Sequence, residues 1–471
     1  MEPAGNAASD FHTARRSSPP PYDSESENAG RDAEKHELSK QVNLSPKWQD
    51  PFADEANAEV KYRSMDWWQA AALMIAETVS LGILSLPSVL ATVGFVPGII
   101  LIVGLGALAT YTGYVIGQFK AAYPHVVNMA DVGEVMLGAW GREIGGASQT
   151  IFLVFVMGSH VLTFNIAMNT ITQHRACTIV WGVVGLVLLW VLTLPRTLKK
   201  VSYLSIVSFI SIITAVLVTM IGVGIKPVPD RSVQAFTTPA FVPAFLAAAN
   251  IIFAFAGHVA FFSFISELKT PEHFPKALYL LQVVDTAMYV LAAALIYAYT
   301  GSKAASPALG NTGPTLRRIA YGLALPTIII AGVIYGHVAS KYIYVRMFRG
   351  TKHLSSRTWL AQGSWGGITL VLWVLAWVIA QSIPNFNQLI GLITSIFASW
   401  FTYGLSGVFW LYLNKGHWTA GWKKSALTAL NLTIVALGAV IMALGLWTSG
   451  VSIANATNGK AWSCADNAVH I

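Results

Sequence analysis

The first long apolar segment, from about residue 67 to residue 90, carries a carboxylate, Glu77, close to its middle. A helix of this length crosses the hydrocarbon core of a bilayer, where an ionisable group costs at least about 2.5 kcal/mol. Glu77 is therefore expected to face a cavity or a partner and not lipid. Ser80, Gly82 and Pro87 favour an opening of the helix at this depth, which is tolerated only where the freed backbone lines a cavity. The segment predicts a broken helix beside a buried acid, a pattern typical of a small-molecule binding site inside a membrane.

The composition is that of a membrane protein. Of the 471 residues, 54% are hydrophobic and only 11% are charged, whereas soluble domains carry about 25% charged residues. The basic residues that follow residue 60 lie in short loops between apolar segments, so they report topology and argue against nucleic-acid binding. No paired acids, His/Cys constellation or metal-site spacing stands out, so neither an enzyme nor a cofactor is expected. A channel would need pore-lining rings or repeated filter sequences, and none is visible.

Residues 1–60 differ from the rest of the chain. They hold 12 of the 22 acidic residues and 6 of the 30 basic ones, and they are rich in Ser and Pro. This composition predicts a disordered cytoplasmic tail. The tail has no signal-peptide pattern. Two interpretations remain open, a passive solvated leader and a regulatory segment that carries phosphorylation or ubiquitination sites.

Eleven apolar spans follow this tail and predict an all-α polytopic membrane protein with eleven transmembrane helices. Their approximate bounds are 67–90, 97–119, 146–170, 177–194, 202–224, 241–265, 277–299, 321–346, 359–381, 386–412 and 427–449. We expect the membrane domain to occupy residues 61–450 and a short C-terminal tail to follow at residues 451–471.

The Lys and Arg residues of the loops predict the orientation. With the N-terminus in the cytoplasm, the inner loops contain 14 of these residues and the outer loops contain 7, which is the expected bias. The C-terminal tail is then extracellular, and Asn455 begins an Asn-Ala-Thr glycosylation sequon on the correct side. Cys177 and Cys464 also fall on the outer side, where they either form a disulfide or remain unpaired.

A second helix break is predicted in the sixth span, where Gly257-His258 interrupts an otherwise apolar run. This span is the first helix of a second set of five. Breaks in corresponding positions of two halves are the best sequence indication of the binding site in a transporter built from inverted repeats. The correspondence lies in the placement of the breaks and not in residue identity.

Four motifs stand in order along the spans: Gly82-Ile-Leu-Ser-Leu-Pro87, Leu194-Pro-Arg-Thr-Leu198 with Tyr203-Leu-Ser205, Phe253-Ala-Phe-Ala-Gly-His258, and Ser382-Ile-Pro-Asn-Phe-Asn387. Together they resemble the amino acid/auxin permease family, and within it the fungal neutral amino acid permeases. The resemblance covers about residues 60–450. It implies a leucine-transporter-type fold of five plus five inverted spans and one extra, with helices one and six broken, and transport of amino acids, usually with protons and in some branches with sodium. Sodium-coupled relatives tend to have an asparagine where this chain has Ala76-Glu77-Thr78, which argues against sodium.

The two breaks are the predicted substrate site. Backbone amides of the first span would hold a substrate carboxylate, and carbonyls of the sixth span would take the ammonium. The residues concerned are Val79, Ser80, Leu81 and Gly82, and Phe253, Ala254, Phe255, Ala256 and Gly257. The apolar surroundings favour an uncharged side chain, with a phenylalanine of the sixth span as a wall. The alternatives are that Ser80 and Gly82 only permit close helix packing and that the phenylalanines belong to the core or face lipid.

Three residues are candidates for proton coupling. Glu77 is either a proton acceptor or the static partner of a buried cation, and Lys341 in the eighth span is the cation considered. Lys341 would alternatively extend to the cytoplasmic interface. His258 is either a proton relay or a neutral hydrogen-bonding residue between helices. Asp285 in the seventh span is interpreted as a helix–helix contact.

These observations and the resemblance together favour a proton-coupled symporter of neutral aliphatic and aromatic amino acids that works by alternating access. Its partners would be the amino acid, the proton and the lipid bilayer. The expected location is the plasma membrane, with the vacuolar membrane as the alternative. A vacuolar amino acid exporter and a transporter-like amino acid sensor remain open as alternative functions.

Overall fold

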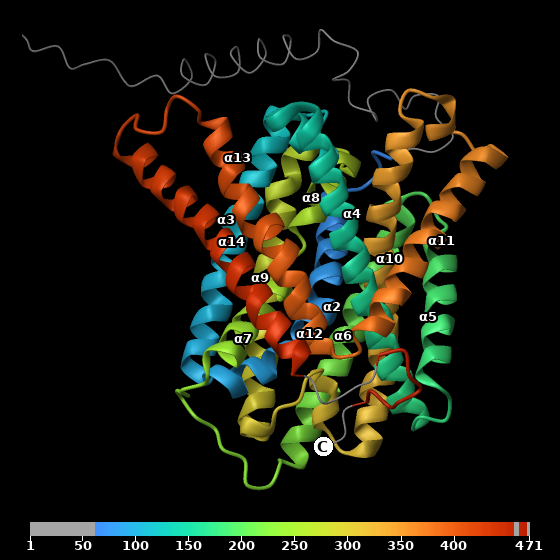
Figure 1. Ribbon diagram of the computed structural model, residues 1–471, viewed down its shortest axis with the longest axis vertical. Helices are drawn as coiled ribbons and strands as arrows, with labels where there is room; N and C mark the ends of the chain where they lie inside the picture. Colours follow the sequence, from blue (N-terminus) through green and yellow to red (C-terminus); the bar gives the residue numbers. More distant parts are fainter. Residues whose placement is uncertain (1–61, 456–460, 469–471) are drawn as a thin grey trace, which may run out of the picture. The chain divides into compact units, whose positions relative to one another are not determined.

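The computed structural model describes residues 62–455 and 461–468, and helices dominate this part of the chain (Figure 1). The longer helices are α2 (Trp67–Val93), α3 (Phe95–Ala122), α4 (Met129–Thr172), α5 (Thr178–Thr193), α6 (Leu198–Ile225), α7 (Phe241–Ala254), α8 (His258–Glu267), α9 (Phe274–Thr300), α10 (Pro314–Phe348), α11 (Trp359–Ser382), α12 (Phe386–Ile393), α13 (Leu405–Leu413) and α14 (Trp422–Ala454). A π-helical segment, Thr394–Gly404, joins α12 to α13.

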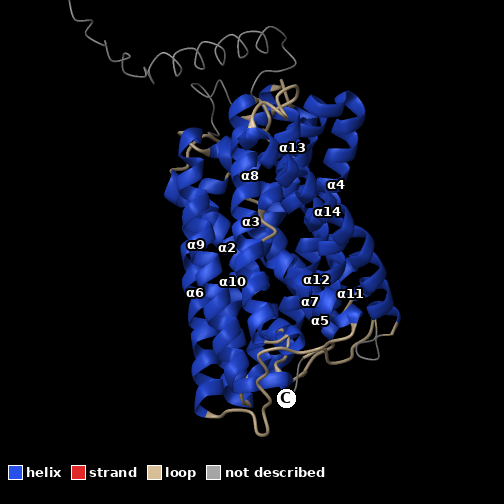
Figure 2. Ribbon diagram, turned by 90° about the vertical axis from the view of Figure 1, so that its left-hand side faces the viewer, coloured by secondary structure: helices blue, strands red, loops and turns tan. Residues whose placement is uncertain are grey.

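Within the described residues, eleven helical segments correspond to the eleven predicted spans, which confirms the all-α polytopic fold. Ten of them are long and apolar enough to cross a membrane by length and composition, and the eleventh is the shorter apolar helix α5. Three of the ten combine several helical elements: α7 with α8, α9 with a short 3-10 helix at each end, and α12 with the π-helical segment and α13. Figure 2 shows the long helices running side by side.

Helix α4 is longer than the predicted third span because it includes a hairpin. The chain reverses at Gly138, whose φ of 68° and ψ of −148° lie outside the helical region and favour glycine. The two arms then approach so closely that a Cβ on Gly133 would lie 2.0 Å from the carbonyl oxygen of Gly141. Small residues thus allow the first part of α4 to fold back on the beginning of the membrane span.

The predicted break in the first span is wrong for this structure, because α2 is a continuous helix from Trp67 to Val93. Its glycine serves close packing instead. A Cβ on Gly82 would lie 2.6 Å from the Cα of Ala254 in α7. Pro87 lies within the helix without ending it. The amides of Val79 to Gly82 therefore belong to a regular helix here and are not free to bind a ligand.

The predicted break in the sixth span is confirmed. Helix α7 ends at Ala254 and α8 begins at His258, with Phe255, Ala256 and Gly257 between them. The two pieces belong to one membrane span, so the interruption lies at membrane depth. All three connecting residues are buried.

A disulfide joins Cys177 to Cys464, 287 residues apart in the chain. The C-terminal segment around Cys464 also packs on the start of α5, where the Thr178 hydroxyl donates to the Ala465 carbonyl at 2.7 Å. We call the end of the helix bundle with this disulfide the disulfide face, and the opposite end, where α2 begins, the N-terminal face (Figure 1).

Two predictions concern chain segments at the ends. The tail at residues 1–60 lies outside the described residues. Asn455 is an exposed residue directly after α14, and the other two residues of its sequon also lie outside the described part. The C-terminal tail from residue 451 begins inside α14, because that helix continues to Ala454.

Candidate functional site

The break between α7 and α8 brings together two helix ends of opposite polarity. The C-terminal end of α7 carries carbonyl groups and partial negative charge, and the N-terminal end of α8 carries free amides and partial positive charge. Three of these carbonyls already accept a hydrogen bond: Ile252 from the Phe255 amide, Phe253 from the Ala256 amide, and Ala254 from the Tyr289 hydroxyl of α9 at 2.7 Å. A zwitterion placed at this break would meet complementary charge at both of its ends.

Glu77 lies directly beside this break. A Cβ built on Gly257 would lie 3.6 Å from Glu77 Oε2, so the carboxyl group points at the connection between α7 and α8. The side chain is 2% exposed, and neither carboxyl oxygen has a partner with hydrogen-bond geometry among the described residues. The Tyr335 hydroxyl on α10 and the Asp285 carboxyl on α9 are the polar groups that act electrostatically on the Glu77 carboxyl.

The other predicted substrate residues surround the same point, and all are buried. The ring of Phe255 is held by packing and is not open to the break. It lies edge-on against the Tyr289 ring, with 5.1 Å between centroids. It also fills the space beside Gly106 of α3, where a Cβ would lie 2.9 Å from the Phe255 ring. Phe255 thus has the alternative role of core packing. On α2, the hydroxyl of Ser80 is buried and lacks a hydrogen-bond partner in the described structure.

His258 connects α8 to α3. Its Nε2 lies 2.8 Å from the carbonyl oxygen of Ala109 and 3.1 Å from the hydroxyl of Thr112. A carbonyl only accepts, so Nε2 carries a proton and donates to it. This is the hydrogen-bonding role between helices that was considered beside the relay role.

The interpretation of Lys341 as the partner of Glu77 is wrong, because Lys341 forms an ion pair with Glu267 at the end of α8. Both side chains are almost fully buried, at 3% and 0% exposure. Lys341 therefore does not extend to the interface either. Glu267 was missed because the sixth span was expected to end at residue 265. Apolar residues continue on both sides of Ser263 in the sequence. This pattern indicates that the last turn of the span, with Glu267, stays inside the bundle.

Tyr62 and the residues that follow it cover this ion pair from the N-terminal face. The ammonium of Lys341 lies 4.7 Å above the Tyr62 ring, a cation–π contact. The Glu267 backbone carbonyl accepts from the amides of Ser64 and Met65 at 3.1 and 3.0 Å. Burial raises the pKa of the Tyr62 hydroxyl to about 12, against the opposing influence of Arg196, so this tyrosine is neutral at physiological pH. The segment before α2 thus closes the N-terminal face above Glu267.

A cavity of about 260 Å³ opens toward the disulfide face. It is lined by the end of α2, the first half of α7, the start of α12 and Ser452 near the end of α14. Its polar lining includes Asn250, Asn385 and Asn387, and Asn250 lies about one helical turn before the break. This cavity therefore lies on the disulfide side of the break, and the segment before α2 covers the opposite face.

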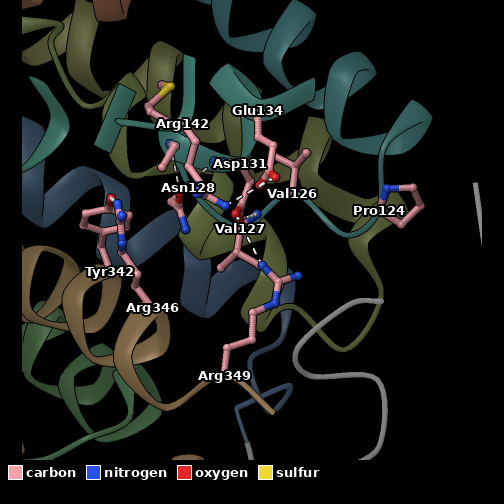
Figure 3. Close-up of polar contacts among 12 residues, drawn as sticks. Pro124, Val126, Val127, Asn128, Asp131, Glu134, Arg142, Tyr342, Arg346 and Arg349 are labelled. Atoms are coloured by element: carbon pink, nitrogen blue, oxygen red, sulfur yellow. Dashed lines mark hydrogen bonds and ion pairs between the residues drawn. The ribbon is translucent and has the colours of Figure 1, made fainter. Parts of the chain in front are cut away.

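A second cavity of about 260 Å³ lies at the N-terminal face, between the hairpin of α4 and the end of α10. Figure 3 shows its charged lining: Arg349 reaches toward Asp131, at 3.6 Å, and Asp131 also accepts from the Val127 amide at 2.8 Å. Arg142 approaches Glu134 at 3.4 Å. The third arginine of the lining, Arg346, pairs with Glu143 at 2.8 Å, so each of the three arginines has an acidic partner.

A family model described as "Transmembrane amino acid transporter protein" matches residues 63–450. The chain belongs to this family. It is 34% identical over 430 residues to the "N amino acid transport system protein" of Neurospora crassa, with 88% of this chain and 91% of that protein covered. It is 30% identical over 421 residues to a "Transmembrane transporter" of Gibberella moniliformis, with 87% and 89% covered.

More distant matches agree. The chain is 26% identical over 399 residues to the "Amino acid transporter AVT1H" of Arabidopsis thaliana, with 80% of this chain and 87% of that protein covered. Among solved structures, the crystal structure of MhsT in complex with L-phenylalanine has a TM-score of 0.52 at 13% identity and covers 83% of this chain and 100% of that one. This likeness shows that the transporter has the leucine-transporter-type fold.

Two of the family motifs have structural roles in this transporter. Arg196 caps the loop between α10 and α11, where it donates to the Ser356 carbonyl at 2.6 Å, and its guanidinium lies 4.7 Å from the Tyr344 ring centroid. Asn385 caps α12 by accepting from the Gln388 amide at 3.2 Å. Asn387 accepts from the Ser306 hydroxyl at 2.7 Å inside the cavity of the disulfide face.

The contact between Gly82 and Ala254 leads to a first prediction. Extra atoms in a packed interior cost about 1–3 kcal/mol, and here the clash involves backbone. Gly82→Val is therefore expected to raise the half-saturation concentration for amino acid uptake or to eliminate uptake, while the protein still reaches the membrane. Gly322→Val on α10 is the control, since a Cβ there meets nothing within 4 Å. Normal uptake kinetics in a properly inserted Gly82→Val protein would show that the α2–α7 contact is not needed for transport.

Proposed function

We propose that this transporter is a proton-coupled symporter of neutral amino acids that works by alternating access. The observation that carries the proposal is Glu77, a buried carboxyl beside the break whose oxygens lack hydrogen-bond partners among the described residues. An ionised carboxylate in such a place is strongly disfavoured unless it is paired. Glu77 would therefore hold a proton in this state and release it when the site opens to the other side.

The proposed substrate class rests on the chemistry of the break. The ends of α7 and α8 suit the carboxylate and ammonium that all amino acids share, and the surrounding Phe253, Ala254 and Ala256 are apolar. No Lys, Arg or His contacts the carboxyl of Glu77 within the described residues. A charged substrate side chain would thus find no strong partner. The name of the Neurospora crassa relative, an amino acid transport system protein, supports an amino acid as the substrate.

The proposed substrate contacts are those of the break, with Phe253 to Gly257 on one side and Val79 to Gly82 on the other. The amides of the α2 residues become available only if α2 opens near Gly82 during the cycle, as the resemblance to transporters with two broken helices implies. In the present state the amides nearest to Glu77 are those at the start of α8, of which the Ala260 amide already donates to the Gly257 carbonyl at 3.1 Å. We therefore propose α8 as the first carboxylate contact.

The proposed topology places the disulfide face outside and residues 1–60 in the cytoplasm, with 61–450 as the transporter domain. The excess of Lys and Arg in the loops on the side of the N-terminus supports this orientation. The Cys177–Cys464 bridge supports it as well, because disulfides persist in oxidising compartments. The proposed location is the plasma membrane.

Thiol labelling tests this topology. A membrane-impermeant maleimide applied to intact, reduced cells is expected to label Cys464, and untreated cells should be labelled less because the bridge protects both sulfurs. Cys464→Ser should make Cys177 reactive without a reductant. Labelling that requires permeabilised cells would place the disulfide face inside and contradict the orientation.

Transport itself is tested with the purified full-length protein in lipid vesicles. Labelled leucine or phenylalanine should accumulate when an inward proton gradient is imposed in sodium-free buffer. A sodium gradient without a proton gradient should not drive accumulation. Accumulation that depends strictly on sodium would contradict the proposal.

A further inference from the structure

Asp285 on α9 is a second fully buried acid next to the same break. It is 0% exposed. Its Oδ2 lies 2.6 Å from the hydroxyl of Thr78, and its Oδ1 has no hydrogen-bond partner in the described part of the chain. Asp285 is also close enough to Glu77 for the two carboxyls to repel each other when both are ionised.

Thr78 is the neighbour of Glu77 in the chain and a hydrogen-bond partner of Asp285. It directly follows Glu77, and its methyl group lies 2.8 Å from a Cβ built on Gly257, so both side chains border the break. Its hydroxyl lies 2.9 Å from the Met74 carbonyl and 2.6 Å from Asp285 Oδ2. A hydroxyl has one proton to donate, and a carbonyl only accepts. When Thr78 donates to Met74, Asp285 must be the donor and therefore carries a proton. When Asp285 is ionised, Thr78 must turn toward it.

The surroundings supply no positive charge. The titratable groups that face the two acids are Tyr335 of α10 and Tyr289 of α9, both neutral hydroxyls. His258 at the start of α8 is directed to the Ala109 carbonyl of α3. Among the described residues, no Lys or Arg contacts either carboxyl. Two like charges at this depth without a cation are strongly disfavoured.

We propose that Asp285 is a second proton-binding residue of the transport cycle, coupled to Glu77 by the repulsion between the two carboxylates and adjusted by its hydrogen bond with the hydroxyl of Thr78. The pair gains one proton from water on the disulfide face, forming one carboxyl O–H bond, and returns it to water on the N-terminal face. Because the charges are coupled, the apparent protonation behaviour belongs to the pair and not to one acid. This inference rests on the proposed proton coupling and extends it to a residue that the sequence suggested was only a helix contact.

The experiment measures the pH dependence of exchange between internal and external labelled leucine in vesicles, with no gradient imposed. Thr78→Val removes the hydroxyl and Thr78→Ser retains it. Thr78→Val is expected to move the pH midpoint of exchange upward by about one unit, a tenfold change in proton affinity, because the ionised Asp285 loses its donor. Thr78→Ser should leave the midpoint unchanged.

Asp285→Asn is expected to abolish proton-driven accumulation while exchange continues, and Asp285→Glu should restore part of the accumulation. Gln282→Met is the control, because it removes a buried polar group one turn away on α9. Wild-type accumulation in Asp285→Asn, or equal midpoints for the two Thr78 variants, would overturn the inference. If Asp285→Asn does not fold, the comparison of the pH midpoints of Thr78→Val and Thr78→Ser tests the inference alone. Failure of the proposed proton coupling can be told apart from failure of this inference, because Glu77→Gln would then also accumulate substrate normally.

Discussion

Replacing Glu77 by glutamine is expected to abolish proton-driven accumulation of amino acid and to leave exchange of internal for external substrate largely intact. Glutamine has nearly the shape of a protonated glutamate, so the buried surroundings of Glu77 accept it. It cannot release a proton, however. The variant is therefore fixed in the protonated form, which binds and exchanges substrate but gains nothing from a proton gradient.

The measurement compares accumulation and exchange in the same vesicle preparation. Glu77→Asp is the matched variant, since it keeps the ionisable group on a shorter side chain and should retain part of the coupling. Undiminished accumulation in Glu77→Gln would remove Glu77 from the coupling mechanism. Loss of exchange with normal folding would mean that the residue binds substrate directly.

The second large effect is expected at the Lys341–Glu267 pair. Removal of one partner of a buried ion pair leaves the other charge buried without compensation and costs about 3–5 kcal/mol. Lys341→Met is therefore expected to lower the thermal unfolding temperature in detergent strongly. The double variant Lys341→Met/Glu267→Met should recover most of the loss, because a well-packed apolar pair replaces buried ions without a desolvation penalty.

The exposed pair between Lys269 and Asp66 provides the control. Its side chains are 50% and 45% exposed, and exposed ion pairs contribute little to stability. Lys269→Met should thus unfold close to the wild-type temperature. If Lys341→Met also unfolds there, the buried pair does not hold the N-terminal face together, and the closure by Tyr62 must rest on other contacts.

The helices were largely predictable because long apolar runs have few other solutions in a membrane. The break at Gly257 was predictable too, since a glycine and a histidine interrupt an apolar run. Gly82 also suggested a helix break, but in this structure it has a different role. A glycine permits both an opened helix and a close approach of two helices, and only the position of Ala254 shows which is used here.

The partners of the charged residues were not predictable. Lys341 pairs with a residue 74 positions away, and its spacing from Glu77 carries no information about which acid it meets. Asp285 was visible as a buried acid, but its contact with Thr78 depends on how α9 packs on α2. The polar lining of the cavity at the disulfide face likewise comes from four helices whose proximity no local pattern records.

The most direct test of proton coupling follows protons and amino acid together. Wild-type protein is placed in sodium-free vesicles that enclose a pH-sensitive dye, with no initial gradient, and leucine is added outside. We predict acidification of the vesicle interior upon leucine addition in the wild type and none in Glu77→Gln. Leucine entry in the wild type without any proton entry would contradict the account.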